Sequence, residues 1–474
     1  MHAKGEKRLK EERKLLDALP QLPDLQCAWL LLYFSAVPKA NHLLRAVPPN
    51  LVHSYAQRHD NEVWRTLLAL LNRKPSAALE RKKQRAQLPC RLGGCGLRCA
   101  SRTAPAAYWA AWADVLPTLR ERFPLLTAGY VAELEVQVRN RQCLNELLQA
   151  RDTLLQEGFE APGFIALAEG AKPEQPRQEE LDPGEWRHGW QYFASKTREE
   201  HFLENFVRPA CTPQEQTLLL SQQGRNNARA LTAVPSDPTT TSSPDRFRVT
   251  LCRRLRLPFL CWAARCEGCG ALLDEYGDHY AACMRSGRVQ ARAKPAERAW
   301  ERVLKEARQG TNAAIHAQHL LRNTTLPIRP TDNRRIDLLV TGFPFHSGKP
   351  LFCDVTMRSP LKGNGQPHPK AARTGGAVLK RAEQDKQTKY GDVEESPLAE
   401  LLVLGCESRR ALERDSRELG TVFGEKQSSE RAPLVEKVCR TRFLRPLVEY
   451  VRCCYSRRFG SFFVGYEWSQ LGNR

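Results

Sequence analysis

The sequence lacks three features of membrane and secreted proteins. Its longest early apolar run, residues 27–37, is too short to cross a bilayer, which takes about 20 apolar residues. The first eight residues carry several charges and lead into more charge, unlike a secretory signal peptide. No basic amphipathic membrane helix or lipidation motif is clear. We therefore expect an intracellular protein with no membrane partner.

The sequence has fewer acidic than basic residues. Lys and Arg total 73 against 53 Asp and Glu, which gives a formal net charge of +20. Such an excess implies a polyanionic partner, and nucleic acid is the usual one. An anionic membrane is the competing explanation, but it needs the features that are missing above. We expect DNA as a partner and a nuclear location.

Cysteine is abundant, with 16 residues, but no signal peptide accompanies it. This combination favours a reduced compartment in which some cysteines bind metal. The length of 474 residues allows two to four domains. The clearest predicted boundary is the Pro-, Ser- and Thr-rich stretch 232–245, whose composition is typical of a flexible linker.

The N-terminal part has the apolar spacing of amphipathic helices over residues 25–71. Residues 73–102 then hold nine Lys or Arg and one acid, and an aromatic run follows at 108–112. Basic side chains beside aromatics suit a nucleic-acid backbone and its bases. The alternative is that Trp109 and Trp112 are helix core beside a solvated basic surface.

Cys90, Cys95 and Cys99 lack a fourth ligand nearby, so we interpret them as structural.

Four potential metal ligands follow the predicted linker and a run of arginines. Cys266 and Cys269 are separated by two residues, and Gly268 and Gly270 ease the tight turn that this spacing needs. His279 and Cys283 are four residues apart, so one helical turn places both on the same face. Two such pairs close a tetrahedral Zn²⁺ site of structural type. We also expect Asp278 to contact His279.

Two short apolar runs, residues 334–340 and 351–357, each carry one acid. The Gly- and Pro-rich segment 342–350 joins them, which predicts adjacent strands of one sheet. Asp337 and Asp354 would then lie together and attract a hard cation such as Mg²⁺. A metal held in this way can activate water against a phosphodiester. Two acids at the strand ends of a surface hairpin are the alternative.

The elements around this hairpin predict a small mixed α/β domain. We expect a helix at 297–307, an extended stretch at 326–329, the two acid-bearing strands, a helix at 371–382 and a strand at 398–404. Charged residues 409–425 and basic, aromatic residues 443–466 are predicted to be helical.

Part of the N-terminal region resembles the segment downstream of the palm in reverse transcriptases of non-LTR retrotransposons. The segments that carry the resemblance are residues 42–49, 59–60, 88–98 and 104–114. It implies a helical thumb-like region that grips template and primer, with element RNA as a partner. No Asp-Asp pair, the metal box of a polymerase palm, occurs in residues 25–125. We therefore expect no reverse transcriptase activity, and such a domain on another chain becomes an implied partner.

The order of elements behind the Cys-Cys-His-Cys knuckle resembles the restriction-like endonuclease of site-specific non-LTR retrotransposons, a member of the PD-(D/E)XK fold. The resemblance implies a hydrolase that nicks target DNA, with Asp337 and Asp354 as the Mg²⁺-binding acids. Ile336 replaces the proline of the signature. Thr356 stands where the signature has lysine, and the enzymes resembled here take that lysine from the following helix.

The stretch that matches this helix is residues 382–390. It offers Lys386 as the catalytic lysine, with Lys389 as the second choice and Tyr390 in support. The chemistry requires a cation near the attacking water or the scissile phosphate. A solvated helix lysine is the alternative for Lys386.

These observations predict a multidomain chain with an α-helical N-terminal region, a small zinc knuckle and a mixed α/β PD-(D/E)XK-like domain. The predicted order is a thumb-like region at 1–130, a helical connector at 131–231, the linker, a basic segment with the knuckle at 246–290 and the endonuclease at 291–474. The first functional hypothesis is a metal-dependent DNA endonuclease of retroelement origin. The second is an inactive retroelement remnant that only binds nucleic acid. A scaffold without a nucleic-acid role is disfavoured by the positive charge.

Overall fold

The structure is a computed structural model that describes most of the chain up to residue 407. The described residues are 2–137, 141–175, 188–224, 227–236, 238, 240–259, 265–307, 312–343 and 348–407. The helices predicted at 409–425 and 443–466 lie outside them, as does the end of the predicted endonuclease domain.

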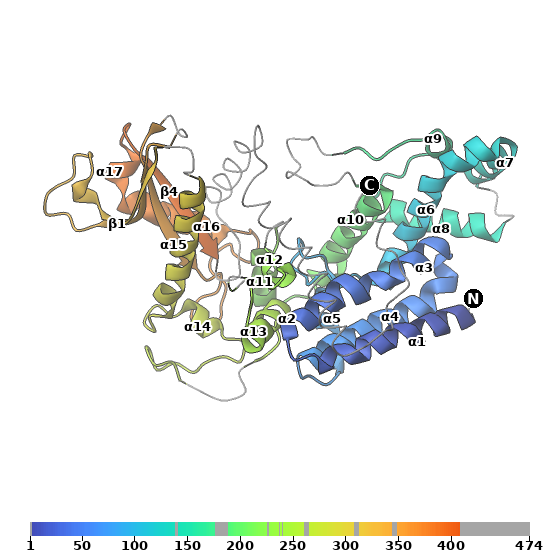
Figure 1. Ribbon diagram of the computed structural model, residues 1–474, viewed down its shortest axis with the longest axis horizontal. Coiled ribbons are helices and arrows are strands. Elements are labelled where there is room, and N and C mark those ends of the chain that lie inside the picture. Colours follow the sequence, from blue (N-terminus) through green and yellow to red (C-terminus); the bar gives the residue numbers. More distant parts are fainter. Residues whose placement is uncertain are drawn as a thin grey trace.

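The N-terminal half of the described chain is helical (Figure 1). Its α-helices are α1 (His2–Ala18), α2 (Leu25–Leu31), α3 (Asn41–Ala46), α4 (Pro49–Leu70), α5 (Glu80–Gln87), α6 (Ala100–Arg122), α7 (Pro124–Glu135), α8 (Gln142–Gln156), α9 (Phe164–Ala168), α10 (Trp190–Phe202), α11 (Pro213–Ser221), α12 (Arg229–Thr232) and α13 (Pro244–Leu255). Short 3₁₀ or π turns are Leu19–Gln21, Leu32–Ala36, Val37–Ala40, Ala77–Leu79 and Leu203–Val207.

Two large hydrophobic cores hold these helices, together with smaller clusters around Leu44 and Leu219. The first surrounds Trp29 and Leu67, which are fully buried, and the indole Nε1 of Trp29 donates to the Leu231 carbonyl at 2.7 Å. The second surrounds Trp109 of α6, whose ring packs edge-on against Phe159 at a centroid distance of 5.2 Å. Full burial of one large apolar side chain contributes about 1.5–3 kcal/mol. Trp109 is therefore helix core, the alternative that the sequence left open.

The predicted boundary at 232–245 does not separate two cores. Phe247 and Leu251 of α13 lie in the first core together with Trp29. The side chain of Gln26 donates to the carbonyls of Ala233 and Thr240 at 3.0 Å each, which ties the described part of the linker to α2. The basic segment after the linker thus belongs to the helical half, because its apolar residues complete that core.

The C-terminal half contains a mixed sheet of four strands. Its elements are α14 (Asp278–Ala282), α15 (Arg288–Ala307), β1 (Ala314–Leu320), a 3₁₀ turn (Leu321–Asn323), β2 (Arg335–Thr341), β3 (Leu351–Arg358), α16 (Ala377–Lys389), α17 (Gly391–Glu394) and β4 (Glu400–Glu407). The strand order is β1-β2-β3-β4, with β1, β2 and β3 antiparallel in turn and β3 parallel to β4.

Two predicted elements differ from these bounds. The stretch 326–329 forms no strand, because Pro327 lacks an N–H for a sheet and Pro330 follows at once. The first strand is instead β1, whose middle residues are exposed and therefore give no apolar run. The helix expected from 371 begins at 377, since Gly376 adopts a left-handed conformation with φ 75° at its start.

Helices cover both faces of the sheet. Leu304 of α15 packs with Val340 and Cys353 on one face. On the other face, Tyr390 and Val393 pack against Phe352 and Val403 at the C-terminal end of α16. This packing fixes α15 and α16 relative to β2 and β3.

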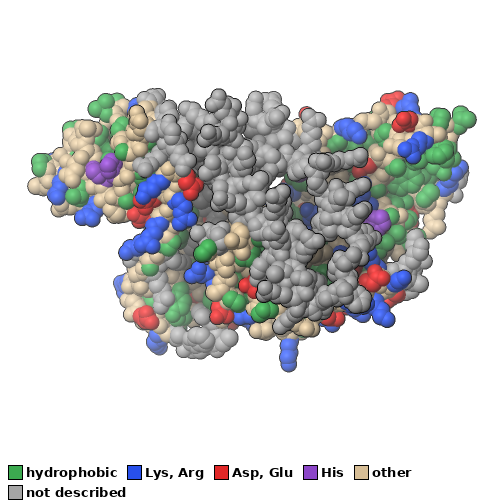
Figure 2. All heavy atoms as spheres, viewed as in Figure 1, with side chains coloured by type: hydrophobic (Ala, Val, Ile, Leu, Met, Phe, Trp, Pro, Cys, Tyr) green, Lys and Arg blue, Asp and Glu red, His purple; other side chains and the backbone are tan. Residues whose placement is uncertain are grey.

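The sheet lies at one end of the molecule and the helical bundle at the other, with α13 between them and α14 below α15 and α16 in this view (Figure 1). Lys and Arg side chains gather below the strand-bearing end in the view of Figure 2. The halves touch through α11: Gln214 donates to Gln366 at 3.3 Å. Burial raises the pKa of Glu407.

Candidate active site and metal centre

The carboxylate of Asp337 joins β2 to β3 at the point where their backbone pairing ends. The paired residues are Val340 with Leu351, Leu339 with Phe352 and Leu338 with Cys353. At the next position, Oδ2 of Asp337 accepts a hydrogen bond from the Val355 N–H at 2.8 Å. The side chain thus replaces a backbone acceptor, which brings the Asp337 carboxylate beside Asp354 on β3.

The two acids share a partly buried environment. Asp354 is buried, with 2% of its surface exposed, and Asp337 is half-buried. The pKa of Asp337 is raised, first by burial, then by the negative charge of Asp354, and further by Glu297. Nearby like charges oppose ionisation, and a cation between them removes that opposition. The electrostatics of this pair therefore favour a bound cation.

Lys386 is the cation that the structure places at this site. Its Nζ donates to Oδ1 of Asp354 at 2.9 Å and lies 2.7 Å from Oδ2. The lysine side chain is 20% exposed and that of Asp354 is 3% exposed, so solvent screens this ion pair little. Thr356 is buried on β3 and supplies no charge. Lys386 therefore contacts Asp354 directly, and its role in catalysis stays a prediction.

Tyr390 and Lys389 occupy different positions around the same carboxylate. The buried phenol oxygen of Tyr390 lies 3.0 Å from Oδ1 of Asp354 on β3 and 2.9 Å from the Arg335 carbonyl on β2, and its single proton can donate to either oxygen. Burial and the charge of Asp354 raise the pKa of Tyr390. Lys389 donates to the phenol at 2.7 Å. Lys389 thus reaches the acids through Tyr390, whereas Lys386 contacts Asp354 directly.

Two residues that the sequence reasoning missed complete the surroundings of Asp337. The amide Nε2 of Gln318 on β1 donates to Oδ1 of Asp337 at 3.2 Å and to Oε1 of Glu297 on α15 at 2.7 Å. Gln318 has a positive φ of 51°, which is uncommon for a residue with a side chain. Since β1 was not predicted, no sequence signal placed Gln318 beside the hairpin. Glu297 begins the helix predicted at 297–307, but nothing in the sequence placed that helix against the hairpin.

The predicted knuckle residues come together in space. The ligand atoms of Cys266, Cys269, His279 and Cys283 all lie within 4.8 Å of one another. Sγ of Cys269 lies 3.2 Å from Nε2 of His279, and the Sγ atoms of Cys266 and Cys283 lie 3.7 Å apart. The pKa of Cys266 is lowered, chiefly by the backbone N–H of Gly268. This cluster can hold a metal ion.

The local backbone explains how the cluster forms. Asp274 accepts hydrogen bonds from the N–H groups of Asp278 at 2.9 Å and His279 at 2.7 Å, which caps the start of α14. A side chain at Gly268 would collide with the Arg285 carbonyl, so only glycine fits in the turn between the two cysteines.

The outer contact of His279 differs from the prediction. Its Nδ1 lies 2.8 Å from the carbonyl of Gly363, a residue of the loop after β3. The predicted partner, Asp278, instead forms an ion pair with Arg256. The cluster is therefore connected directly to a loop of the sheet half, a contact that spans 84 residues of sequence.

The basic run before α6 is divided between surface and interior. Lys74, Arg81 and Arg98 are exposed, whereas Arg85 is buried and donates to Gln222 at 2.9 Å. The exposed residues of the run are available for an anionic partner.

Comparison with known proteins adds no relative to these observations: no protein family model matches the chain, and no curated protein matches it. Among the described residues, no helix combines the length and apolar character that a bilayer crossing requires.

Proposed function

We propose that this chain is a metal-dependent DNA endonuclease of retroelement origin, with a PD-(D/E)XK-type site built from Asp337, Asp354 and Lys386. The observation that carries the proposal is the convergence of these three side chains from β2, β3 and α16 at one point. Thr356 stands at the lysine position of the signature, and the sequence resemblance implies that the following helix supplies this lysine. Lys386 lies on that helix, α16.

The oxygen atoms at this point fit a hard divalent cation. Oδ2 of Asp354 is buried and accepts no hydrogen bond from the residues that the structure describes, although the Lys386 ammonium lies 2.7 Å away. Carboxylate oxygens are the ligands that Mg²⁺ prefers. A bound Mg²⁺ would supply an activated water and would neutralise charge on the phosphate.

The chain's own residues supply the rest of the proposed chemistry. Asp337 and Asp354 hold the cation, and Lys386 stabilises negative charge as it develops on the phosphate. Tyr390 orients the Asp354 carboxylate through its phenol. The Cys-His cluster is proposed to bind Zn²⁺ in a structural role, because four Cys and His ligands leave no open position for catalysis.

A second function is favoured by one observation. Lys386 lies within 2.9 Å of both oxygens of Asp354, so the pair can also be a buried structural ion pair. In that case the chain binds nucleic acid through its basic surfaces but does not cut it. In both functions the proposed partner is DNA in the nucleus, with element RNA and a separate reverse transcriptase domain as further partners.

Cleavage of plasmid and branched DNA in Mg²⁺ distinguishes the two functions. We expect Asp337→Ala and Asp354→Asn to abolish cutting. We expect Lys386→Met to slow single-turnover cutting by about 100-fold, a typical loss for one transition-state contact. Lys380→Met is the matched control, because Lys380 is exposed on the same helix. Thermal unfolding of each variant checks that it is folded. Cutting that depends on Mg²⁺ and persists in both aspartate variants would contradict the nuclease.

A further inference from the structure

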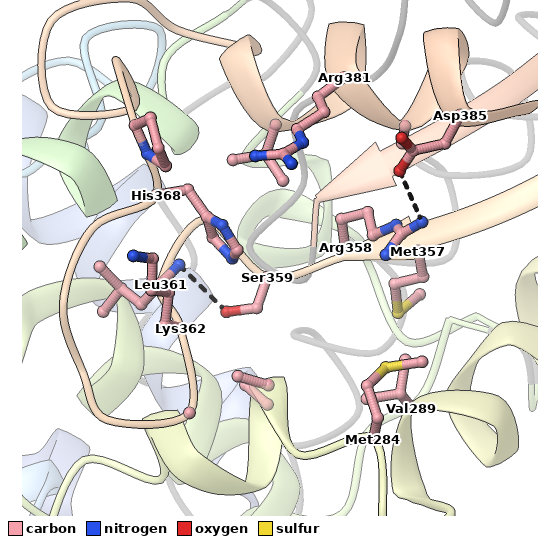
Figure 3. A pocket seen from close by; sticks show the side chains of 16 residues that line it. Met284, Val289, Met357, Arg358, Ser359, Leu361, Lys362, His368, Arg381 and Asp385 are labelled. Carbon is pink, nitrogen blue, oxygen red and sulfur yellow. Dashed lines mark hydrogen bonds and ion pairs between the residues drawn. The ribbon is translucent and has the colours of Figure 1, made fainter.

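A cavity of about 480 Å³ lies between the segment 281–289, which begins within α14 next to the Cys-His cluster, and the elements β3 and α16 of the sheet half (Figure 3). Its walls come from the end of α14, the start of α15, the end of β3, the loop 359–369 and α16. The volume is within the range of about 300–1,000 Å³ that is usual for small-ligand sites. No residue of the proposed catalytic group lines it.

The lining of this cavity has an apolar side and a cationic side. Met284, Val289 and Met357 lie on one side, and Met284 is 57% exposed. Lys362, His368 and Arg381 lie on the other side (Figure 3). An occupant should therefore combine an apolar face with negative charge.

The cationic side carries unbalanced positive charge. Burial lowers the pKa of His368, and the nearby charges of Lys362, Arg381 and Arg358 lower it further. Arg358 is 3.4 Å from Asp385, the acid in the lining. In the part of the chain that the structure describes, the side chains of Lys362 and Arg381 form no ion pair. Both are exposed and available to an anion.

Two elements, β3 and α16, lead from the proposed catalytic site to the cavity. Arg358 follows Asp354 by four residues on β3, a distance of about 13 Å along a strand. Arg381 precedes Lys386 by five residues on α16, a rise of about 7.5 Å. Successive nucleotides of a B-form strand rise about 3.4 Å, so a strand at Asp354 reaches the cavity within about four nucleotides.

We propose that this cavity holds one unpaired nucleotide of the DNA strand near the scissile phosphate, with the base between Met284 and Met357 and the phosphate on Lys362 and Arg381. Thioethers make favourable contacts with aromatic rings, which include bases. The hydroxyl of Ser359 accepts from the Leu361 N–H at 3.2 Å, so its own proton remains for the nucleotide. The proposal rests on DNA as the substrate class of the proposed function but does not require cleavage.

Binding without cutting tests the cavity directly. The full chain, in a magnesium-free buffer, is titrated with a short oligothymidine and with an abasic oligomer that carries the same number of phosphates. We expect the base-bearing oligomer to bind about tenfold more tightly, because one well-placed base contributes a free energy of this order to binding. Met284→Ser should reduce this preference to near unity. Lys362→Gln should weaken both oligomers by the same factor, because both retain their phosphates.

The matched control is Leu272→Ser, since Leu272 is 64% exposed and lies outside the cavity lining. This variant should keep the wild-type preference. An equal affinity of the wild-type chain for the two oligomers would overturn the proposal, as would an unchanged preference in Met284→Ser. Cleavage assays on the same proteins report separately on the nuclease. A preserved base preference with no cutting rejects the nuclease alone, and cutting without a base preference rejects the cavity alone.

Discussion

At the scale of single residues, the strongest feature is the Asp337 carboxylate, whose ionised form is disfavoured in the folded chain. Asp337 is half-buried beside Asp354 and Glu297, and its pKa is raised by burial first and by these charges next. The folded chain therefore binds a proton at Asp337 at higher pH than the unfolded chain does. The contribution of Asp337 to the free energy of unfolding therefore falls as pH rises from its ordinary pKa of 3.8 through its raised pKa in the folded chain. Above the raised pKa, this loss of stability persists.

We predict that Asp337→Asn raises the thermal midpoint at pH 7 in a buffer free of divalent ions. The asparagine oxygen can still accept from the Val355 N–H. The variant loses the long 3.2 Å hydrogen bond from Gln318 to Oδ1, but it buries no charge, and we expect the second effect to be larger. Below the ordinary pKa the wild-type carboxyl is protonated in both states, so the difference should vanish there. Calorimetry across pH measures this, with Asp245→Asn as the control because the Asp245 side chain is 94% exposed.

Addition of Mg²⁺ gives the same pair of proteins a second readout. A cation that binds only the folded state at 100 times its dissociation constant stabilises it by about 2.7 kcal/mol. The wild-type chain should gain this stability, and Asp337→Asn should gain little. A variant that is less stable than the wild-type chain at pH 7 without divalent ions would contradict our account of Asp337.

At the scale of elements, the connection between the Cys-His cluster and the loop 361–367 leads to a prediction. His279 contacts both Cys269 and the Gly363 carbonyl, so a metal ion that orients its ring also positions the loop. We expect about one zinc per chain by elemental analysis. Cys283→Ser should lose the metal and should increase amide hydrogen exchange in residues 361–367.

The internal reference for this exchange experiment is α6, whose residues lie in the helical cores. Its protection should be the same in Cys283→Ser and in the wild-type chain. A folded wild-type chain that contains no metal would refute the prediction, and so would a metal-free variant in which the loop exchanges at the wild-type rate.

The elements that the sequence predicted are those with a local signal. Both acid-bearing strands formed where apolar runs and turn residues indicated them, and the spacing of Cys266, Cys269, His279 and Cys283 was sufficient to foresee their cluster. The elements that it missed depend on distant partners. β1 has exposed middle residues and is a strand only because β2 pairs with it. The assignment of α13 to the helical core depends on packing against α2, some 200 residues earlier.

At the scale of the whole molecule, the helical half and the sheet half both carry exposed positive charge. The formal net charge is +20, and exposed cations occur in both halves, for example Arg98 before α6 and Arg381 on α16. The hydrogen bond of Gln214 on α11 with Gln366 connects the halves. If the proposed function holds and the helical half binds a duplex, this connection would place that duplex relative to the aspartate site.

The salt dependence of DNA binding tests this shared surface. If both halves touch the backbone, about 6–10 phosphates are engaged, and affinity should fall by about 10³–10⁵ between 50 and 200 mM salt. Lys74→Gln, Arg81→Gln and Arg98→Gln together should reduce the slope of log affinity against log salt by about 0.9 for each phosphate that these side chains neutralise in the wild-type complex. The control replaces Lys10 and Lys14, exposed on α1, to separate a local effect from that of general charge. A slope near zero in the wild-type chain, or an equal reduction per charge in the control, would show that this basic run does not bind DNA.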